Sequence, residues 1–175
     1  MTLIEKPRRI RSLRLKKLVS SFIVVVFLLI PILLGSAERR MTVGIANNNP
    51  GNVRPLNWKS WSGAVGVNGH GYMVFRSPQY GIRAIRIILL AYQTKHGIRT
   101  PHGIVSRWVG KEASQIQMQE YTKELCRRLG RVDEYKRLNL KDDETMRIII
   151  RAIIFYENGY DPYGKYYYQR AAELK

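Results

Sequence analysis

The sequence predicts a mainly α-helical domain of the α+β type, with one small β-hairpin, behind a single N-terminal segment long enough to cross a membrane. Three observations support this prediction. Residues 18–35 are uncharged and strongly apolar. Amphipathic stripes with their own start and stop signals fill most of the chain after residue 77. Residues 72–75 form the one convincing short strand, so we expect little β structure.

The N-terminal segment has the features of a membrane anchor. Residues 1–17 contain seven Lys and Arg and a single acid, a local charge of +6, and the 18 residues that follow are just long enough to span a bilayer as a helix. The positive-inside rule places this basic head in the cytoplasm. Everything beyond the linker at 36–42 then lies outside the cytoplasm. A cleaved signal peptide is the alternative, with Gly35 and Ala37 as the small residues of its cleavage site.

The expected domain, residues 43–175, is dominated by helices that carry their own caps. Ser77 and Thr100 each precede a proline at a first helical position, and Ser114 forms a capping box with Gln117. A glycine follows the apolar stripe of each segment and ends the helix. The predicted helices cover residues 78–96, 101–109, 115–129 and 143–158, Asp161 is expected to cap a final one, and residues 64–67 are expected to pair with 72–75 in the hairpin.

Residues 44–54, GIANNNPGNVR, are the densest turn signal in the chain. Asn49, Pro50 and Gly51 supply an extended residue, a fixed φ and a residue free to adopt a positive φ, which together predict a type II turn. The amides crowded into this segment belong to Asn47, Asn48, Asn49 and Asn52. They can hold the loop together through bonds to the backbone, or they can point outward and bind a polar polymer such as a glycan.

Charge and cysteine content restrict the kinds of site that the chain can form. Residues 39–111 contain eleven Lys and Arg and no Asp or Glu, so any carboxylate chemistry has to come from Glu38 or from Glu112 onward. Cys126 is the single cysteine, which excludes an intramolecular disulfide and a cysteine-rich metal site. The sequence also lacks the common nucleotide-, zinc- and calcium-binding motifs, so we expect neither a metal nor a cofactor.

Glu157 is the candidate catalytic residue. It lies in the last turn of the predicted helix 143–158, and on a helical wheel it returns to within about 20° of Met146 in the apolar stripe. A carboxyl group there loses hydration and faces the negative end of the helix dipole, and both effects favour the protonated form that a general acid needs. The alternative is a structural role, in which Glu157 accepts hydrogen bonds from a neighbouring loop or pairs with Arg54 or Arg107.

Four segments form a signature that runs through the expected domain: GIANNNPGNVR, GIRA at 81–84, LLAYQTKHGIRTPHGIVSRW at 89–108 and RAIIFYENGYDPY at 151–163. In this order they resemble a family of small bacteriophage and prophage proteins described as virion structural proteins. That family is similar to lysozyme-like, peptidoglycan-cleaving virion proteins, and the resemblance covers most of residues 43–165. This chain departs from the family pattern at Ala46, at residues 109–117 and at Tyr156, where the family has a histidine before Glu-Asn-Gly.

The resemblance implies a lysozyme-like fold and a membrane-anchored protein that degrades peptidoglycan during cell entry or lysis, as a lytic transglycosylase or a muramidase. The domain would then lie at the host inner membrane and periplasm or at a virion membrane. A muramidase needs two carboxylates, so its second acid would come from Glu38, Glu112, Glu120 or Asp161. A transglycosylase needs one, because the 6-hydroxyl of the sugar is the nucleophile, and this fits the acid-free half of the domain better. Glu157 would then act first as the acid and afterwards as the base. The expected substrate-binding residues are Asn47, Asn48, Asn49, Asn52, Arg54, Trp58, Arg107 and Tyr163.

Two other classes of function are compatible with the same sequence. A non-enzymatic virion or membrane structural protein would keep the fold and contact other virion proteins. A domain that binds an anionic polymer such as DNA would account for the 23 bases and 12 acids, a charge of +11, beyond residue 17. The expected topology disfavours DNA, because it places the domain outside the cytoplasm. The expected partners are therefore peptidoglycan and a membrane, with virion proteins and nucleic acid as alternatives.

Overall fold

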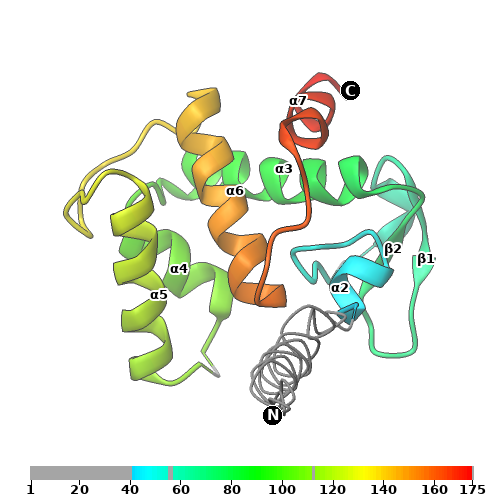
Figure 1. Cartoon of the computed structure of the whole chain (residues 1–175), viewed down its shortest axis with the longest axis horizontal. Helices are drawn as coiled ribbons and strands as arrows, with labels where there is room; N and C mark the ends of the chain where they lie inside the picture. The colour runs from blue at the N-terminus through cyan, green and yellow to red at the C-terminus, as the bar shows by residue number, and fades with distance from the viewer. Residues whose placement is uncertain (1–40, 55–56, 112, 175) are drawn as a thin grey trace, which may run out of the picture. The chain divides into compact units, whose positions relative to one another are not determined.

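The computed structural model describes residues 41–174 apart from 55–56 and 112 (Figure 1). The basic head and the apolar segment predicted within residues 1–35 lie outside the described residues, as does most of the linker. Among the described residues, no helix is both long enough and apolar enough to cross a bilayer.

The mainly helical prediction is confirmed, and local caps explain where the first long helices begin and end. α3 (Pro78–His96) ends at Gly97, whose left-handed φ of 66° lets the next amide, that of Ile98, donate to the Tyr92 carbonyl in the last turn. α4 (Pro101–Val109) begins after Thr100, whose hydroxyl accepts a hydrogen bond from the Gly103 amide. Both boundaries agree with the expected starts and stops.

The next two helices are also delimited by their own residues. Ser114 forms the predicted capping box at the start of α5 (Gln115–Arg128). Asp142 caps α6 (Asp143–Asn158), and Gly159 ends it with a φ of 74°. The four helices that carry clear cap signals in the sequence are therefore found where those signals place them.

The prediction that Asp161 caps the last helix is wrong. α7 (Lys165–Glu173) begins after Gly164, and Asp161 lies before it in the chain with a nearly buried carboxylate. Its oxygens accept hydrogen bonds from the Arg151 guanidinium at 2.7 Å and from the Tyr168 hydroxyl at 2.8 Å. Oδ1 also accepts a bond from the Tyr163 amide at 3.0 Å, so the carboxylate closes a local turn and ties α6 to α7 instead of capping a helix.

The hairpin is the one sheet in the described part of the chain. β1 (Ala64–Val67) pairs antiparallel with β2 (Met73–Phe75), as predicted, with an irregularity in register near the start of β1. Two short elements were not predicted: the single-turn helix α2 (Val43–Ala46) and the 3₁₀ helix η1 (Trp58–Ser60). Both flank the asparagine-rich segment, so the loop is entered from a helical turn.

The core lies where α6 crosses α3 (Figure 1). α4 and α5 pack together on one side of this crossing, the hairpin and α2 lie toward the other, and α7 covers α3. The apolar stripe predicted for α6 is buried, with Met146, Ile149 and Ile153 at most 1% exposed. It packs with Ile85 and Leu89 of α3 in one cluster, so the last turn of α6 is held against the asparagine-rich loop.

Glycines let the asparagine-rich loop approach the helices closely. A Cβ on Gly81 in α3 would lie 2.0 Å from the carbonyl oxygen of Asn48, a distance that no real contact reaches. A Cβ on Gly44 would lie 2.7 Å from Oδ1 of Asn52. The loop therefore sits directly on α3 and α2, and its position is fixed by backbone contact.

Candidate functional site

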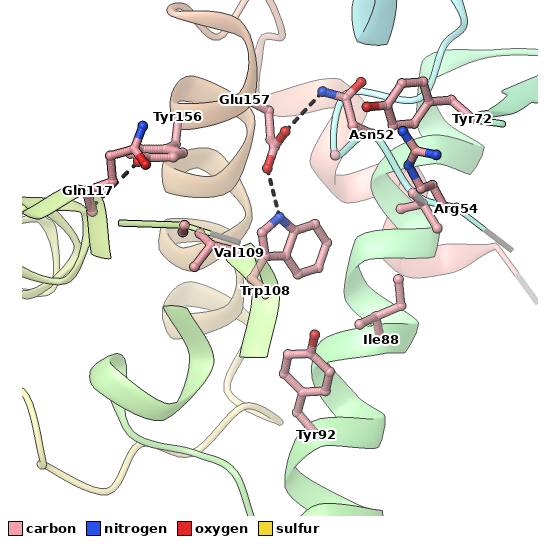
Figure 2. Close-up of a pocket in the computed structure, with 13 residues that line it drawn as sticks. Asn52, Arg54, Tyr72, Ile88, Tyr92, Trp108, Val109, Gln117, Tyr156 and Glu157 are labelled. Carbon is pink, nitrogen blue, oxygen red and sulfur yellow. Dashed lines mark hydrogen bonds between the residues drawn. The ribbon is translucent and has the colours of Figure 1, made fainter. Parts of the chain in front are cut away.

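A cleft of about 820 Å³ opens where the asparagine-rich loop, α3, α4 and the last turn of α6 meet (Figure 2). It is within the size range of ligand-binding sites, about 300–1,000 Å³. Its lining residues are Gly51, Asn52, Val53, Arg54, Tyr72, Ile88, Tyr92, Trp108, Val109, Ala113, Gln117, Tyr156 and Glu157. Among the described lining residues, Glu157 is the one acid and Arg54 the one base.

Glu157 lies in the cleft with both carboxylate oxygens hydrogen-bonded (Figure 2). Oε2 accepts a bond from the Asn52 side-chain amide at 2.9 Å, and Oε1 accepts one from the Trp108 indole N–H at 3.0 Å. Both donors are neutral, and none of the ion pairs among the described residues involves Glu157. The pairing with Arg54 or Arg107, considered as part of the alternative structural role, is therefore not present in this part of the chain.

Glu157 is less buried than the helical wheel predicts. Met146, on the same face of α6, is fully buried, whereas Glu157 is half-buried at the cleft. The reason is that α6 extends beyond the core in its last turn, so the apolar face becomes the wall of an open cleft. A side chain that points inward at that level meets the cleft instead of packed hydrophobic residues.

Asn52 is brought to Glu157 by an unusual backbone conformation. Its φ is 49°, in the left-handed region that asparagine tolerates better than most residues. The side-chain oxygen of Asn52 is buried without a hydrogen-bond partner among the described residues. The amide therefore makes its side-chain hydrogen bond to the carboxylate through its N–H group.

The other asparagines of the loop face inward and serve the fold. Asn49 is completely buried, and its amide donates to the carbonyls of Val53 and Met73 while its oxygen accepts from the Val53 amide. Asn48 donates to the carbonyl of Phe75, which joins the loop to β2. The side-chain nitrogen of Asn47 is buried and does not line the cleft. Of the four loop asparagines, Asn52 is the one at the cleft.

Asn158 explains why an asparagine follows the candidate acid in the Glu-Asn-Gly sequence. Its side-chain amide donates to the Ile154 carbonyl one turn back and to the Pro50 carbonyl of the loop, at 2.8 and 2.7 Å. Its oxygen accepts a bond from the hydroxyl of Thr42. The residue therefore clamps the end of α6 to the loop that supplies Asn52.

Trp108 is a site residue that the sequence prediction missed in favour of its neighbour Arg107. Adjacent residues in a helix point about 100° apart, so when the indole of Trp108 turns to Glu157, the Arg107 side chain lies exposed at the surface. Arg107 instead approaches the hydroxyl of Tyr92, which lines the cleft. Burial raises the pKa of Tyr92, and the adjacent guanidinium partly opposes this increase.

Aromatic residues flank Glu157 along the cleft. Tyr156 is 40% exposed and stacks on Tyr121 with ring centroids 3.8 Å apart and planes only 8° from parallel. Burial, and next the negative charge of Glu157, raise the pKa of Tyr121 well above its usual range. In Figure 2, Tyr156 lies on one side of Glu157, and Asn52, Tyr72 and Arg54 lie on the other. The carboxylate thus occupies the middle of an elongated surface.

The remaining predicted residues lie elsewhere. Tyr163 is 9% exposed and belongs to the hydrophobic core, where burial raises its pKa. Trp58 begins η1, and the position of its side chain lies outside the described part of the structure. Glu120 is exposed on α5 and does not line the cleft. Glu38 and Glu112, two other candidates for a second acid, lie outside the described residues.

The site combines one oriented carboxylate with aromatic faces and neutral hydrogen-bond donors. No group of three or more metal-ligating side chains occurs among the described residues. The chemistry that this set of groups offers is proton transfer by Glu157, with Asn52 and Trp108 holding the carboxyl group in one orientation.

Comparison with known proteins relates this sequence to a phage protein. No family model matches the sequence. Over 123 residues the chain is 32% identical to Protein P5 of Pseudoalteromonas phage PM2, and the aligned region covers 69% of this chain and 73% of that protein.

Proposed function

We propose that this chain, which belongs to the family of Protein P5 of Pseudoalteromonas phage PM2, is a virion protein of a phage or prophage. We further propose that it cleaves the glycan strands of peptidoglycan. One observation carries the proposal. Glu157 is held by two hydrogen bonds at the middle of an elongated cleft whose walls suit a chain of sugars.

The shape of the cleft supports a polymeric substrate. An aromatic side chain with an apolar face and a polar tip, such as Tyr156, is suited to a sugar ring, which likewise has apolar and polar sides. Tyr156 is kept in a fixed plane by its stack on Tyr121. Because the cleft continues past Glu157 to Tyr72 and Arg54 (Figure 2), a strand lying in it would have groups bound on both sides of the carboxyl group.

The single described acid in the lining favours the lytic transglycosylase reaction. Protonated Glu157 would donate its proton to the glycosidic oxygen as the bond from that oxygen to C1 of the sugar breaks. The 6-hydroxyl of the same sugar would then bond to C1 and return its proton to Glu157. The products are a free hydroxyl on one strand end and an anhydro ring on the other, no water is consumed, and the carboxyl group regains its initial state.

The identity of the product tests this proposal. Purified full-length protein is incubated with peptidoglycan, and the released fragments are analysed by mass spectrometry. We expect muramic acid ends that are lighter by one water than the hydrolysed form, because an internal hydroxyl replaces water as the nucleophile. Hydrolysed ends would instead support a muramidase with a second acid, and no release at all would contradict the enzymatic proposal.

Trp108 provides a test of how the carboxyl group is held. Trp108→Phe keeps an aromatic ring at the position but removes the N–H that bonds to Glu157 at 3.0 Å. Since hydrogen bonds to charged groups contribute about 1.5–3 kcal/mol, we expect cleavage to fall by roughly 10- to 100-fold. Tyr92→Phe is the matched control, because it removes a hydroxyl from the same cleft without touching Glu157. Full activity of Trp108→Phe would show that the indole does not orient the acid.

A non-enzymatic virion protein is a second candidate, favoured by a specific observation. The same bonds that orient Glu157 also join the loop, α4 and α6, and Asn158 adds a further bond between α6 and the loop. A purely structural protein would benefit from this network as well. The two candidates predict different effects of removing the charge of Glu157. Cleavage is lost if the residue is catalytic, and folding stability is lost if it is structural.

A further inference from the structure

Arg54 has the surroundings of a binding residue. It lies in the cleft lining, and its side chain is exposed, with the guanidinium carbon 4.1 Å from the centroid of the Tyr72 ring. Gly71 has a φ of 80°, and a Cβ there would lie 3.2 Å from Nη1 of Arg54. The ring and the adjacent glycine therefore let the guanidinium lie flat against the protein, with its N–H edges free to contact a ligand.

The charge on Arg54 is not neutralised within the described part of the chain. None of the ion pairs among these residues includes Arg54, and residues 39–111 contain no acid that could serve as a local partner. Stacking on Tyr72 limits the motion of the guanidinium, so less side-chain entropy is lost when it binds an anion. A planar anion can then bond to two N–H groups at once.

We propose that Arg54 binds a carboxylate carried by the glycan substrate, so that the cleft selects strands with anionic carboxyl substituents over neutral ones. This inference rests on the proposed function and assigns a substrate class to the same cleft. In peptidoglycan such carboxylates belong to the stem peptides or, where a stem has been removed, to the lactyl group on the sugar. Arg54 is a specificity-determining residue in this assignment, and Glu157 performs the proton transfer.

The composition of the lining favours a carboxylate over the phosphates of a nucleic acid. A nucleic acid carries a negative charge on every unit, and its binding sites align several bases along the backbone. Here the described lining offers one base, and a phosphate backbone running along the cleft would have to pass the carboxylate of Glu157. A glycan with occasional carboxylates meets one cation at one point and neutral or aromatic groups elsewhere.

Binding measured without cleavage tests the inference. All variants carry Glu157→Gln, so that the substrate survives, and full-length protein is sedimented with intact peptidoglycan sacculi or with sacculi whose carboxylates have been converted to amides. We expect the Arg54-containing protein to bind native sacculi roughly 10-fold more tightly than amidated ones, since a charge-assisted pair is lost on amidation. Arg54→Gln should bind both forms equally and at the weaker level.

Arg76 supplies the matched control. It is also an exposed arginine stacked on a tyrosine, 4.2 Å from the centroid of the Tyr80 ring, but it does not line the cleft. Arg76→Gln makes the same change in net charge and should preserve the preference for native sacculi. Equal loss in both variants would mean that total charge, and not Arg54, selects the substrate, and would overturn the inference.

Further outcomes separate the inference from the proposed function. If Arg54→Gln keeps the full preference for native sacculi, Arg54 is not the carboxylate site, although peptidoglycan binding stands. If DNA competes with sacculi for the parent protein but not for Arg54→Gln, the site binds phosphate and the carboxylate assignment is wrong. If no variant binds either form of sacculi, the proposed function itself fails. Removing the stems with an amidase then tells whether the stem or the lactyl carboxylate is bound.

Discussion

Glu157→Gln should lower peptidoglycan cleavage by about 10²- to 10⁴-fold, the usual contribution of general acid–base catalysis, while the domain stays folded. The amide has nearly the same shape as the carboxyl group but cannot donate and recover the proton. Its oxygen can still accept the bond from Trp108, and Asn52 can rotate its amide to present its oxygen to the new N–H group. Because both partners are neutral, no unpaired cation is left behind.

Stability and activity measured on the same Glu157→Gln protein distinguish catalysis from structure. We expect the free energy of unfolding to fall by no more than about 1–2 kcal/mol, because the hydrogen bonds remain and only the contribution of the charge to them is lost. A loss of about 3–5 kcal/mol, typical of a broken buried ion pair, would support a structural role. Glu120→Gln, which changes an exposed acid on α5 that does not line the cleft, should alter neither property. A stable and fully active Glu157→Gln would exclude Glu157 as the acid and direct attention to Glu38 and Glu112.

Gly81→Ala should destabilise the domain by about 3 kcal/mol or more, at or above the upper end of the usual range for overpacking. The added methyl group would lie 2.0 Å from the Asn48 carbonyl oxygen and 2.8 Å from the Pro50 ring. Neither neighbour is a flexible side chain, so the loop has to move away from α3. Since the same loop supplies Asn52, cleavage should fall even in molecules that remain folded. Chemical denaturation and cleavage assays measure the two effects.

Gly66→Ala is the control for this substitution. Gly66 lies in β1, and a Cβ there would meet nothing within 4 Å. Its φ is not in the left-handed region, so alanine should be tolerated with little change in stability. If Gly81→Ala is as stable as Gly66→Ala, the loop can shift without cost, and the close approach of loop and helix does not fix the site.

The parts of the fold that were predictable are those encoded by neighbouring residues. The capping box at Ser114, the proline starts and the glycine stops all act within one helical turn, and each was found where expected. The role of Asp161 was not predictable in this way. Its partner Arg151 is ten residues away on another element, and a long-range bond to an arginine outweighed the local preference for a cap.

The candidate site shows the same division between local and long-range information. Glu157 could be selected from helical periodicity, but its partners could not, because Asn52 and Trp108 lie 105 and 49 residues earlier in the chain. The asparagine-rich segment is a turn as predicted, but the predicted type II form is wrong, because Asn52 and not Gly51 has a positive φ. The inward orientation of Asn49 depends on β2, whose Met73 carbonyl accepts a bond from its side-chain amide. Tyr156 stands where the family pattern has a histidine, and in the structure it lines the cleft.

The distance in sequence between Asn52, Trp108 and Glu157 has a consequence during synthesis. A ribosome synthesises the loop first and Glu157 105 residues after Asn52, so a growing chain holds the two hydrogen-bond donors before it holds the acid. Any activity of the cleft that depends on Glu157 is therefore absent from chains that have not yet reached this residue. A cell that makes a wall-degrading protein would be protected from its nascent copies by the order of the chain alone.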